Sequence, residues 1–282
     1  MTRREFKTLF LSALQPLYDS REATAIFRLY LTDRIGIEPH RFLMEPDQEM
    51  DSPIDHNQDI KRLAEGEPLQ YVTGRTEFCG LDLHVDSRAL IPRPETEELV
   101  GRILNDYRDT SGISALDIGT GSGAIAIALA RHLPNASVDA IDLSPSALQL
   151  ARENAERHHV SVRFLCQDIL LPHPLDRTYH LIVSNPPYIP RSDRENMHKN
   201  VRDYEPDMAL FVPDEDPLLF YRAIIRNASQ ALKPSGRLYF ETYENYHAEI
   251  LELMRQAGFS QSESATDLFG RPRFVIGKLC TE

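Results

Sequence analysis

The chain reads Asp117-Ile118-Gly119-Thr120-Gly121-Ser122-Gly123-Ala124 where an apolar strand, predicted at 114–118, meets a helix predicted at 124–132. Glycine permits a positive φ and a close approach of a ligand to the backbone, and free amides at a helix N-terminus suit a carboxylate or pyrophosphate. We therefore interpret this turn as a ligand-binding loop rather than an ordinary connection. Its spacing, Gly119-x-Gly121-x-x-Ala124, also fits a dinucleotide fingerprint, so the loop alone leaves the ligand open.

Strands and helices alternate after this loop. The patterns predict further strands at 137–141, 162–165, 180–184, 236–241 and 274–279, and helices at 146–158 and 217–232. Such alternation with short connections is typical of an α/β fold, in which helices cover both faces of a parallel sheet. Ligands then bind at the carboxyl ends of the strands.

The first 75 residues have a helical period instead. Apolar residues at helical spacing predict one helix at Phe6, Leu9, Phe10, Ala13, Leu14 and Leu17, and a second at Ile26, Phe27, Leu29 and Tyr30. Asp51 or Ser52 could cap another helix that enters at Pro53. Alternation over 78–85 then predicts short strands and a turn. We expect a helical bundle at 1–75 for substrate docking, a β-hairpin linker at 76–92, and a catalytic domain at 93–282.

A carboxylate follows the second predicted strand. Asp142 lies ~20 residues beyond the glycine loop, where an acidic side chain can accept hydrogen bonds from both hydroxyls of a ribose. The alternative is that Asp142 caps the next helix, a role that Ser144 could fill instead.

The fourth predicted strand runs directly into Asn185-Pro186-Pro187-Tyr188. The prolines fix φ and hold the segment extended, so the Asn185 side-chain oxygen and the Pro186 backbone oxygen can point the same way. Two such acceptors can bind the two hydrogens of one planar –NH₂ group, and Tyr188 can lie flat against its plane. A dehydrogenase has no need of this clamp; the alternative is a rigid loop with an exposed aromatic side chain.

Composition limits the partners. There are 31 Lys and Arg against 43 Asp and Glu, a net charge of −12, which disfavours nonspecific binding to nucleic acid. No apolar run approaches the ~20 residues of a membrane span. The cysteines, Cys79, Cys166 and Cys280, are too far apart for a disulfide framework, and no histidine spacing indicates a metal site. We expect a cytoplasmic protein with no metal.

Taken together, the glycine loop, Asp142 and Asn185–Tyr188 resemble a class I S-adenosylmethionine-dependent methyltransferase that acts on an amino nitrogen. The family resemblance narrows to the release-factor glutamine methyltransferases (HemK/PrmC) through Pro68-Leu69-Gln70-Tyr71-Val72-Thr73-Gly74, Leu90-Ile91-Pro92-Arg93-Pro94-Glu95-Thr96-Glu97, Tyr204-Glu205-Pro206 with Ala209-Leu210, and Asp267-Leu268 with Gly270 and Arg273. It implies a Rossmann-like methyltransferase domain, with a mostly parallel seven-stranded sheet, after a helical bundle and a hairpin.

The resemblance also implies roles for residues. The methionine end of the cofactor would lie by Asp117 and the loop residues Gly119, Thr120, Gly121, Ser122 and Gly123. The ribose would bind Asp142, and the adenine would contact Leu143, Asp168 and Ile169. The substrate amide would lie against Asn185 and Pro186, next to Pro187 and Tyr188; Asn185 would also touch the cofactor. Arg93 and Glu97 would either line the mouth of the site or only begin a helix.

The implied reaction gives S-adenosylhomocysteine and methylates the glutamine of the Gly-Gly-Gln motif of class 1 peptide-chain release factors, in translation termination. Alternatives are a glutamine of a ribosomal protein, an adenine N6 of nucleic acid, a nicotinamide dehydrogenase, and a binding module without catalysis. The chain departs from the family pattern at Val212–Pro217, at Tyr243 and at Ile169, which bears on loop shape and adenine packing.

Overall fold

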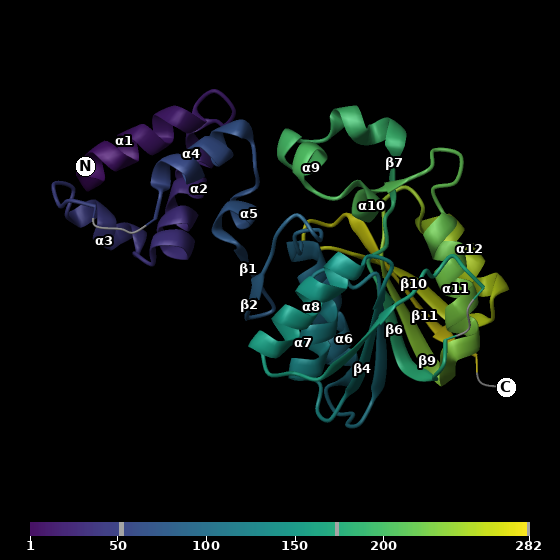
Figure 1. Ribbon diagram of the computed structural model, residues 1–282. Helices are drawn as coiled ribbons and strands as arrows, with labels where there is room; N and C mark the ends of the chain where they lie inside the picture. The colour runs from purple at the N-terminus through teal and green to yellow at the C-terminus, as the bar shows by residue number, and fades with distance from the viewer. Residues whose placement is uncertain (51–53, 173–174, 281–282) are drawn as a thin grey trace. The chain divides into compact units, whose positions relative to one another are not determined.

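The computed structural model describes residues 1–50, 54–172 and 175–280. Contacts between residues divide the chain into two units. The first comprises Met1–Arg75 with His198–Tyr204, and the second comprises Thr76–Met197 with Glu205–Glu282. Figure 1 labels their helices and strands.

The first unit is a helical bundle around aromatic side chains. It contains α1 (Arg3–Leu14), α2 (Ser20–Tyr30), the π-helix η1 (Leu31–Ile35), α3 (Pro39–Met44), α4 (His56–Glu65), α5 (Leu69–Thr73) and α9 (Lys199–Tyr204). Phe6, Phe10 and Phe27 lie in its core, as the helical spacing predicts. The same prediction is wrong for Leu9 and Leu29, whose exposed fractions are 42% and 51%. Both side chains lie beside the buried face of their helix. That face is formed by Phe6, Phe10 and Leu14 in α1 and is centred on Phe27 in α2.

The helix predicted to enter at Pro53 begins later. Asp51, Ser52 and Pro53, where that cap and entry were expected, lie outside the described residues. In the structure α4 begins at His56, and the Asp55 side chain caps it by accepting from the N–H groups of Asn57 and Gln58.

A two-stranded sheet confirms the short strands and turn predicted over 78–85, but its first strand begins three residues before that range. It consists of β1 (Arg75–Phe78) and β2 (Leu81–His84). Cys79 and Gly80 turn the chain with positive φ values of 50° and 74°.

The main sheet has seven strands in the order β10-β11-β9-β6-β3-β4-β5. Their bounds are β3 (Ser114–Ile118), β4 (Ser137–Asp142), β5 (Val162–Cys166), β6 (Tyr179–Ser184), β9 (Leu232–Glu241), β10 (Phe259–Thr266) and β11 (Pro272–Leu279). The five strands from β9 to β5 are parallel, whereas β11 runs antiparallel to both of its neighbours. This confirms the mostly parallel seven-stranded sheet.

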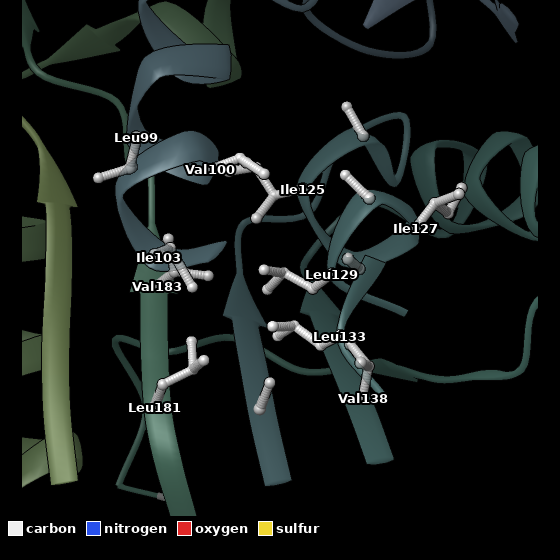
Figure 2. Packing of buried hydrophobic residues seen from close by; sticks show 14 of the residues in the cluster. Leu99, Val100, Ile103, Ile125, Ile127, Leu129, Leu133, Val138, Leu181 and Val183 are labelled. Atoms are coloured by element: carbon white, nitrogen blue, oxygen red, sulfur yellow. The ribbon is translucent and has the colours of Figure 1, made fainter. Parts of the chain in front are cut away.

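Helices cover both faces of this sheet (Figure 1): α6 (Pro94–Tyr107), α7 (Ala124–His132) and α8 (Pro145–Arg157) on one face, and α11 (Leu219–Ala231) and α12 (His247–Gln256) on the other. The two-residue period of a strand divides the core between the faces. In β6, Leu181 and Val183 join the core under α6 and α7, whereas Ile182 joins the core under α11 and α12. Figure 2 shows Ile103 of α6 beside Val183, and Leu129 of α7 on the same side of the sheet.

Several short elements follow β6. They are β7 (Ile189–Pro190), the 3₁₀-helix η2 (Arg191–Asn196), α10 (Asp207–Leu210) and β8 (Phe211–Val212), which pairs in parallel with β7. Two longer elements were also missing from the sequence prediction: α12, and the edge strand β10. In β10 only Phe259 is buried, so its sequence carries no apolar alternation.

Candidate active site

A cavity of about 160 Å³, open to solvent, lies at the carboxyl ends of the parallel strands. Loops that follow four strands bring most of the predicted residues together there: Gly119 and Gly121 after β3, Asp142 and Leu143 at β4, Asp168 and Ile169 after β5, and Asn185, Pro186 and Pro187 after β6. Sequence reasoning missed other lining residues, among them Ala89, Met208 and Phe220. Ala89 comes from a loop, and Met208 and Phe220 come from the starts of α10 and α11.

The glycine loop uses its amides within the protein. The N–H groups of Gly119 and Thr120 donate to the Ile141 carbonyl at 2.9 and 3.1 Å. The Gly121 N–H donates to Asp142 Oδ2 at 2.8 Å. These donors are therefore engaged, which disfavours the dinucleotide interpretation, because a pyrophosphate needs free amides. Gly119 and Gly121 instead take positive φ values and have no side chain, so their backbone atoms themselves form part of the cavity wall.

Asp117 lies fully buried beside this loop. Its Oδ2 accepts from the Thr120 hydroxyl at 2.6 Å and from the Ala126 N–H at 3.2 Å, in the first turn of α7. Its Oδ1 has no hydrogen-bond partner among the described residues. Burial raises the pKa of Asp117 to about 7. A buried carboxylate oxygen without a partner is costly, and a cation would relieve that cost.

Asp142 is held rigidly at the cavity wall. Its Oδ1 accepts from the Ser144 N–H at 2.9 Å, and its Oδ2 accepts from Gly121. Ser144 caps α8 by accepting from the Ala147 N–H, so the capping role belongs to Ser144. Burial raises the pKa of Asp142, and each of its oxygens retains a further lone pair. The side chain can therefore accept from two neighbouring hydroxyls.

Another part of the cavity wall is apolar and contains one acidic side chain. Leu143 and Ile169 line it, and Ile169 is 8% exposed. Asp168 Oδ1 accepts from the Leu170 N–H at 2.9 Å, which fixes the direction of this carboxylate. Apolar side chains with one oriented acceptor suit a planar heterocycle that carries an amino group.

Asn185 connects the cavity to two buried residues that sequence reasoning did not select as site residues. Its Nδ2 donates to Thr96 Oγ1 at 3.2 Å, and the Thr96 hydroxyl donates to Glu241 Oε2 at 2.6 Å. Burial raises the pKa of Glu241 to about 6. Thr96 lies in α6 and Glu241 ends β9, so no local pattern joins them to Asn185.

Tyr188 is not among the described residues that line the cavity. Its ring stacks on Tyr243, with centroids 5.9 Å apart and planes at 24°. Its hydroxyl donates to Glu241 Oε1 at 3.4 Å. In this structure the Tyr188 ring therefore packs on Tyr243, one of the positions where the chain departs from the family pattern.

Arg93 and Glu97 have structural partners and are likewise outside the cavity lining. Arg93 is the N-cap residue of α6 and pairs with the buried carboxylate of Glu205 at 2.5 Å. Glu97 accepts from the Cys79 N–H at 3.0 Å and so holds the turn between β1 and β2.

Three loop residues support the site without lining it. Thr120 and Ser122 are buried, and Gly123 begins α7 with φ of 84°. A Cβ at Gly123 would lie 2.9 Å from Ile127 Cδ1 and 3.0 Å from Ala151 Cβ. Gly123 therefore permits close packing between α7 and α8.

Within the described ranges, no group of three or more His, Cys, Asp or Glu side chains could hold a metal ion. Among the helices of the same ranges, none has the length and apolar character needed to cross a membrane.

Comparisons with known proteins agree with this geometry. A family model described as a methyltransferase domain matches residues 115–204, and one described as a PrmC N-terminal domain matches residues 9–74. A release factor glutamine methyltransferase of Flavobacterium psychrophilum is 39% identical over 280 residues, which covers 98% of each chain. Another of that name, from Bacteroides thetaiotaomicron, is 40% identical and covers 93% of this chain and 95% of its own.

Solved structures resemble the fold. A methyltransferase of Pyrococcus furiosus has a TM-score of 0.53 at 20% identity and covers 72% of this chain and 90% of its own. A 16S rRNA methyltransferase of T. thermophilus, solved with AdoMet and guanosine, has a TM-score of 0.54 at 15% identity and covers 73% of this chain and 49% of its own.

Proposed function

The chain belongs to the release factor glutamine methyltransferase family, and from this premise we propose that it methylates the side-chain amide nitrogen of a release-factor glutamine. The methyl donor is S-adenosylmethionine, and the other product is S-adenosylhomocysteine. The observation that carries the proposal is the position of Asn185 and Pro186 in the wall of an acid-lined cavity. The finer assignment is the glutamine of the Gly-Gly-Gln motif in class 1 peptide-chain release factors, in the cytoplasm.

The residues at the cavity fit this cofactor, which supplies an electrophilic methyl group on a positively charged sulfur. Asp117 is fully buried beside the glycine loop and is not among the described residues that line the cavity, but its unpartnered Oδ1 would accept from the ammonium of the methionine part. Asp142 offers two fixed acceptors for the ribose hydroxyls. Leu143, Asp168 and Ile169 suit the adenine. Acidic side chains in a partly desolvated cavity also favour a cationic ligand over an anionic one.

The protein must make a weak nucleophile react. An amide nitrogen shares its lone pair with the carbonyl group. Hydrogen bonds from its two N–H groups to Asn185 Oδ1 and Pro186 O would return electron density to the nitrogen and hold it in line with the methyl group. Such positioning can supply ~7–11 kcal/mol of a reaction barrier. The same acceptors bind more strongly as the nitrogen becomes positive, which lowers the barrier further. No strong base is needed before transfer.

The first unit, residues 1–75 with 198–204, is proposed to dock the protein substrate. Its bundle contains no group of the proposed reaction, and the family model for the N-terminal domain matches within it. The net charge of −12 favours a protein substrate over nucleic acid, although adenine presents the same –NH₂ chemistry. Transfer of labelled methyl from the cofactor to a purified release factor, to a ribosomal protein fraction and to adenine-rich DNA tests the assignment. The proposal requires label in the release factor and is contradicted by label only in either of the others.

Cofactor binding should depend on pH through Asp117. Burial raises the pKa of this carboxyl to about 7, whereas a bound cation would favour its charged form, so binding should release a proton near pH 7. Through Asp117 alone, the affinity should fall about fivefold between about pH 7 and pH 6 and change little above about pH 8. Calorimetry in buffers of different ionisation enthalpy measures the proton release.

Asp117→Asn removes the titration and should give weaker, pH-independent binding. Exposed Asp109→Asn is the matched control and should retain the wild-type profile. A wild-type profile in Asp117→Asn would show that this carboxyl does not meet the cofactor.

A further inference from the structure

We propose that Thr96 and Glu241 are positioning residues that set the orientation of the Asn185 side-chain amide, so that its oxygen and not its nitrogen faces the substrate. This inference rests on the proposed function, because it concerns how the same site recognises a planar –NH₂ group. It assigns a role to two residues that do not line the cavity.

The three residues form a buried chain of hydrogen bonds. Thr96 is 5% exposed and Glu241 is 2% exposed. The distance from Thr96 Oγ1 to Glu241 Oε2 is 2.6 Å, and that from Asn185 Nδ2 to Thr96 Oγ1 is 3.2 Å. Two tyrosines also hold Glu241: the Tyr188 hydroxyl donates to its carboxylate at Oε1, and the Tyr221 hydroxyl donates to its backbone carbonyl at 3.2 Å.

The number of hydrogens that each group carries fixes which group donates in these hydrogen bonds. A carboxylate can only accept, and a threonine hydroxyl has a single hydrogen, so Thr96 donates to Glu241. Thr96 Oγ1 can then only accept from Asn185, which must turn its Nδ2 toward α6. In a planar amide the oxygen and the nitrogen are bonded to the same carbon and point in different directions. Because the Asn185 Nδ2 is directed at Thr96 and Asn185 lines the cavity, its Oδ1 is available to the ligand.

The orientation matters because the two ends of an asparagine amide have nearly the same shape. Without a fixed partner, Asn185 could present either its oxygen or its –NH₂ group to the cavity. An –NH₂ group facing the –NH₂ group of a glutamine would place donors against donors and lose the recognition. The Glu241–Thr96 pair removes this ambiguity before the substrate binds, which is preorganisation of an acceptor.

Protonation of Glu241 should reverse the donor and acceptor roles in the hydrogen bonds that link Glu241, Thr96 and Asn185. A neutral Glu241 can donate to Thr96 Oγ1, which frees the Thr96 hydrogen for Asn185 Oδ1 and permits the flipped amide. The charged and titratable groups that face Glu241 are Tyr188, Tyr221, Arg273 and Glu95. Burial raises the pKa of both tyrosines, so they stay neutral, and the Arg273 charge favours the Glu241 carboxylate. Because burial raises the pKa of Glu241 to about 6, kcat should fall as the pH drops through that value.

The test compares Thr96→Val, which keeps the shape and removes the hydroxyl, with Thr96→Ser, which keeps the hydroxyl. For methyl transfer to a release factor, Thr96→Val should lower kcat about 10- to 100-fold, whereas Thr96→Ser should stay within about threefold of the wild type. The affinity for S-adenosylhomocysteine should be unchanged in both. The inference is overturned if Thr96→Val retains the wild-type kcat, or if it loses ligand affinity and kcat in parallel, as a structural role would predict.

A second variant covers the case in which Thr96→Val does not fold. In Glu241→Gln the fall in kcat near pH 6 should disappear, because the titrating group is gone. If that fall persists, Glu241 does not control the step. The Asn185 side-chain amide gives an independent readout by ¹H–¹⁵N NMR: its signals should shift with pH near 6 in the wild type and not in Glu241→Gln. If the amide signals shift in this way but no methyl is transferred to a release factor, the proposed substrate is overturned and the proposed orientation of the Asn185 amide stands. If the signals do not shift, the proposed orientation is overturned.

Discussion

Replacing Asn185 with alanine is expected to lower kcat for methyl transfer by at least about 10²–10³-fold, the usual cost of one lost electrostatic contact in a transition state. The reason is that Asn185 Oδ1 would be one of two acceptors for the amide hydrogens, and alanine has no acceptor. Cofactor binding should survive within about threefold, because Asp117, Asp142 and Asp168 would still contact the cofactor. Single-turnover transfer and calorimetric titration with S-adenosylhomocysteine measure the two quantities separately.

The matched control for this variant is Asn105→Ala, at an exposed position of α6. Both variants should fold, since Asn185 is only half-buried. Unchanged turnover in Asn185→Ala would remove the amide clamp from the mechanism. A parallel loss of transfer and of cofactor affinity would make Asn185 a cofactor ligand only.

The second large effect concerns stability. Gly123→Ala should lower the free energy of unfolding by about 2–5 kcal/mol, from about 1–2 kcal/mol of left-handed backbone strain and about 1–3 kcal/mol of overpacking. Both causes are present, because φ is 84° and the new Cβ would lie 2.9 Å from Ile127 Cδ1 and 3.0 Å from Ala151 Cβ. Urea denaturation followed by circular dichroism measures the change.

Gly112→Ala separates the two causes. Gly112 also has a positive φ, of 71°, but a Cβ there meets nothing within 4 Å. This control should therefore lose only the strain part, about 1–2 kcal/mol. Equal losses in the two variants would mean that α7 and α8 can separate to admit a methyl group, and that Gly123 is not a packing requirement.

The sequence predicted the central strands and helices well, because their patterns are local. The bounds predicted for β3 and α7 agree with the structure, since a short apolar run, three glycines and an apolar helix follow one another directly. Likewise, Asp142, Asp168 and Asn185 each follow a strand, and parallel strands bring such positions to one edge of a sheet. Their meeting at one cavity could therefore be predicted without coordinates.

Other features depend on contacts between distant segments. The pairing of Thr96 with Glu241 joins positions 145 residues apart, and it arises because the start of α6 lies beside the end of β9. The stacking of Tyr188 on Tyr243 likewise joins segments that are distant in the sequence. The polar edge strand β10 is defined by its pairing with β11 rather than by its own side chains. No local pattern carries this information.

The most direct measurement is tandem mass spectrometry of a class 1 release factor incubated with the enzyme and S-adenosylmethionine. We expect one added methyl group on the side-chain amide nitrogen of the Gly-Gly-Gln glutamine, and none when the enzyme carries Asn185→Ala. A methyl group on a different kind of atom, or an unmodified release factor beside methylated adenine in DNA, would contradict it.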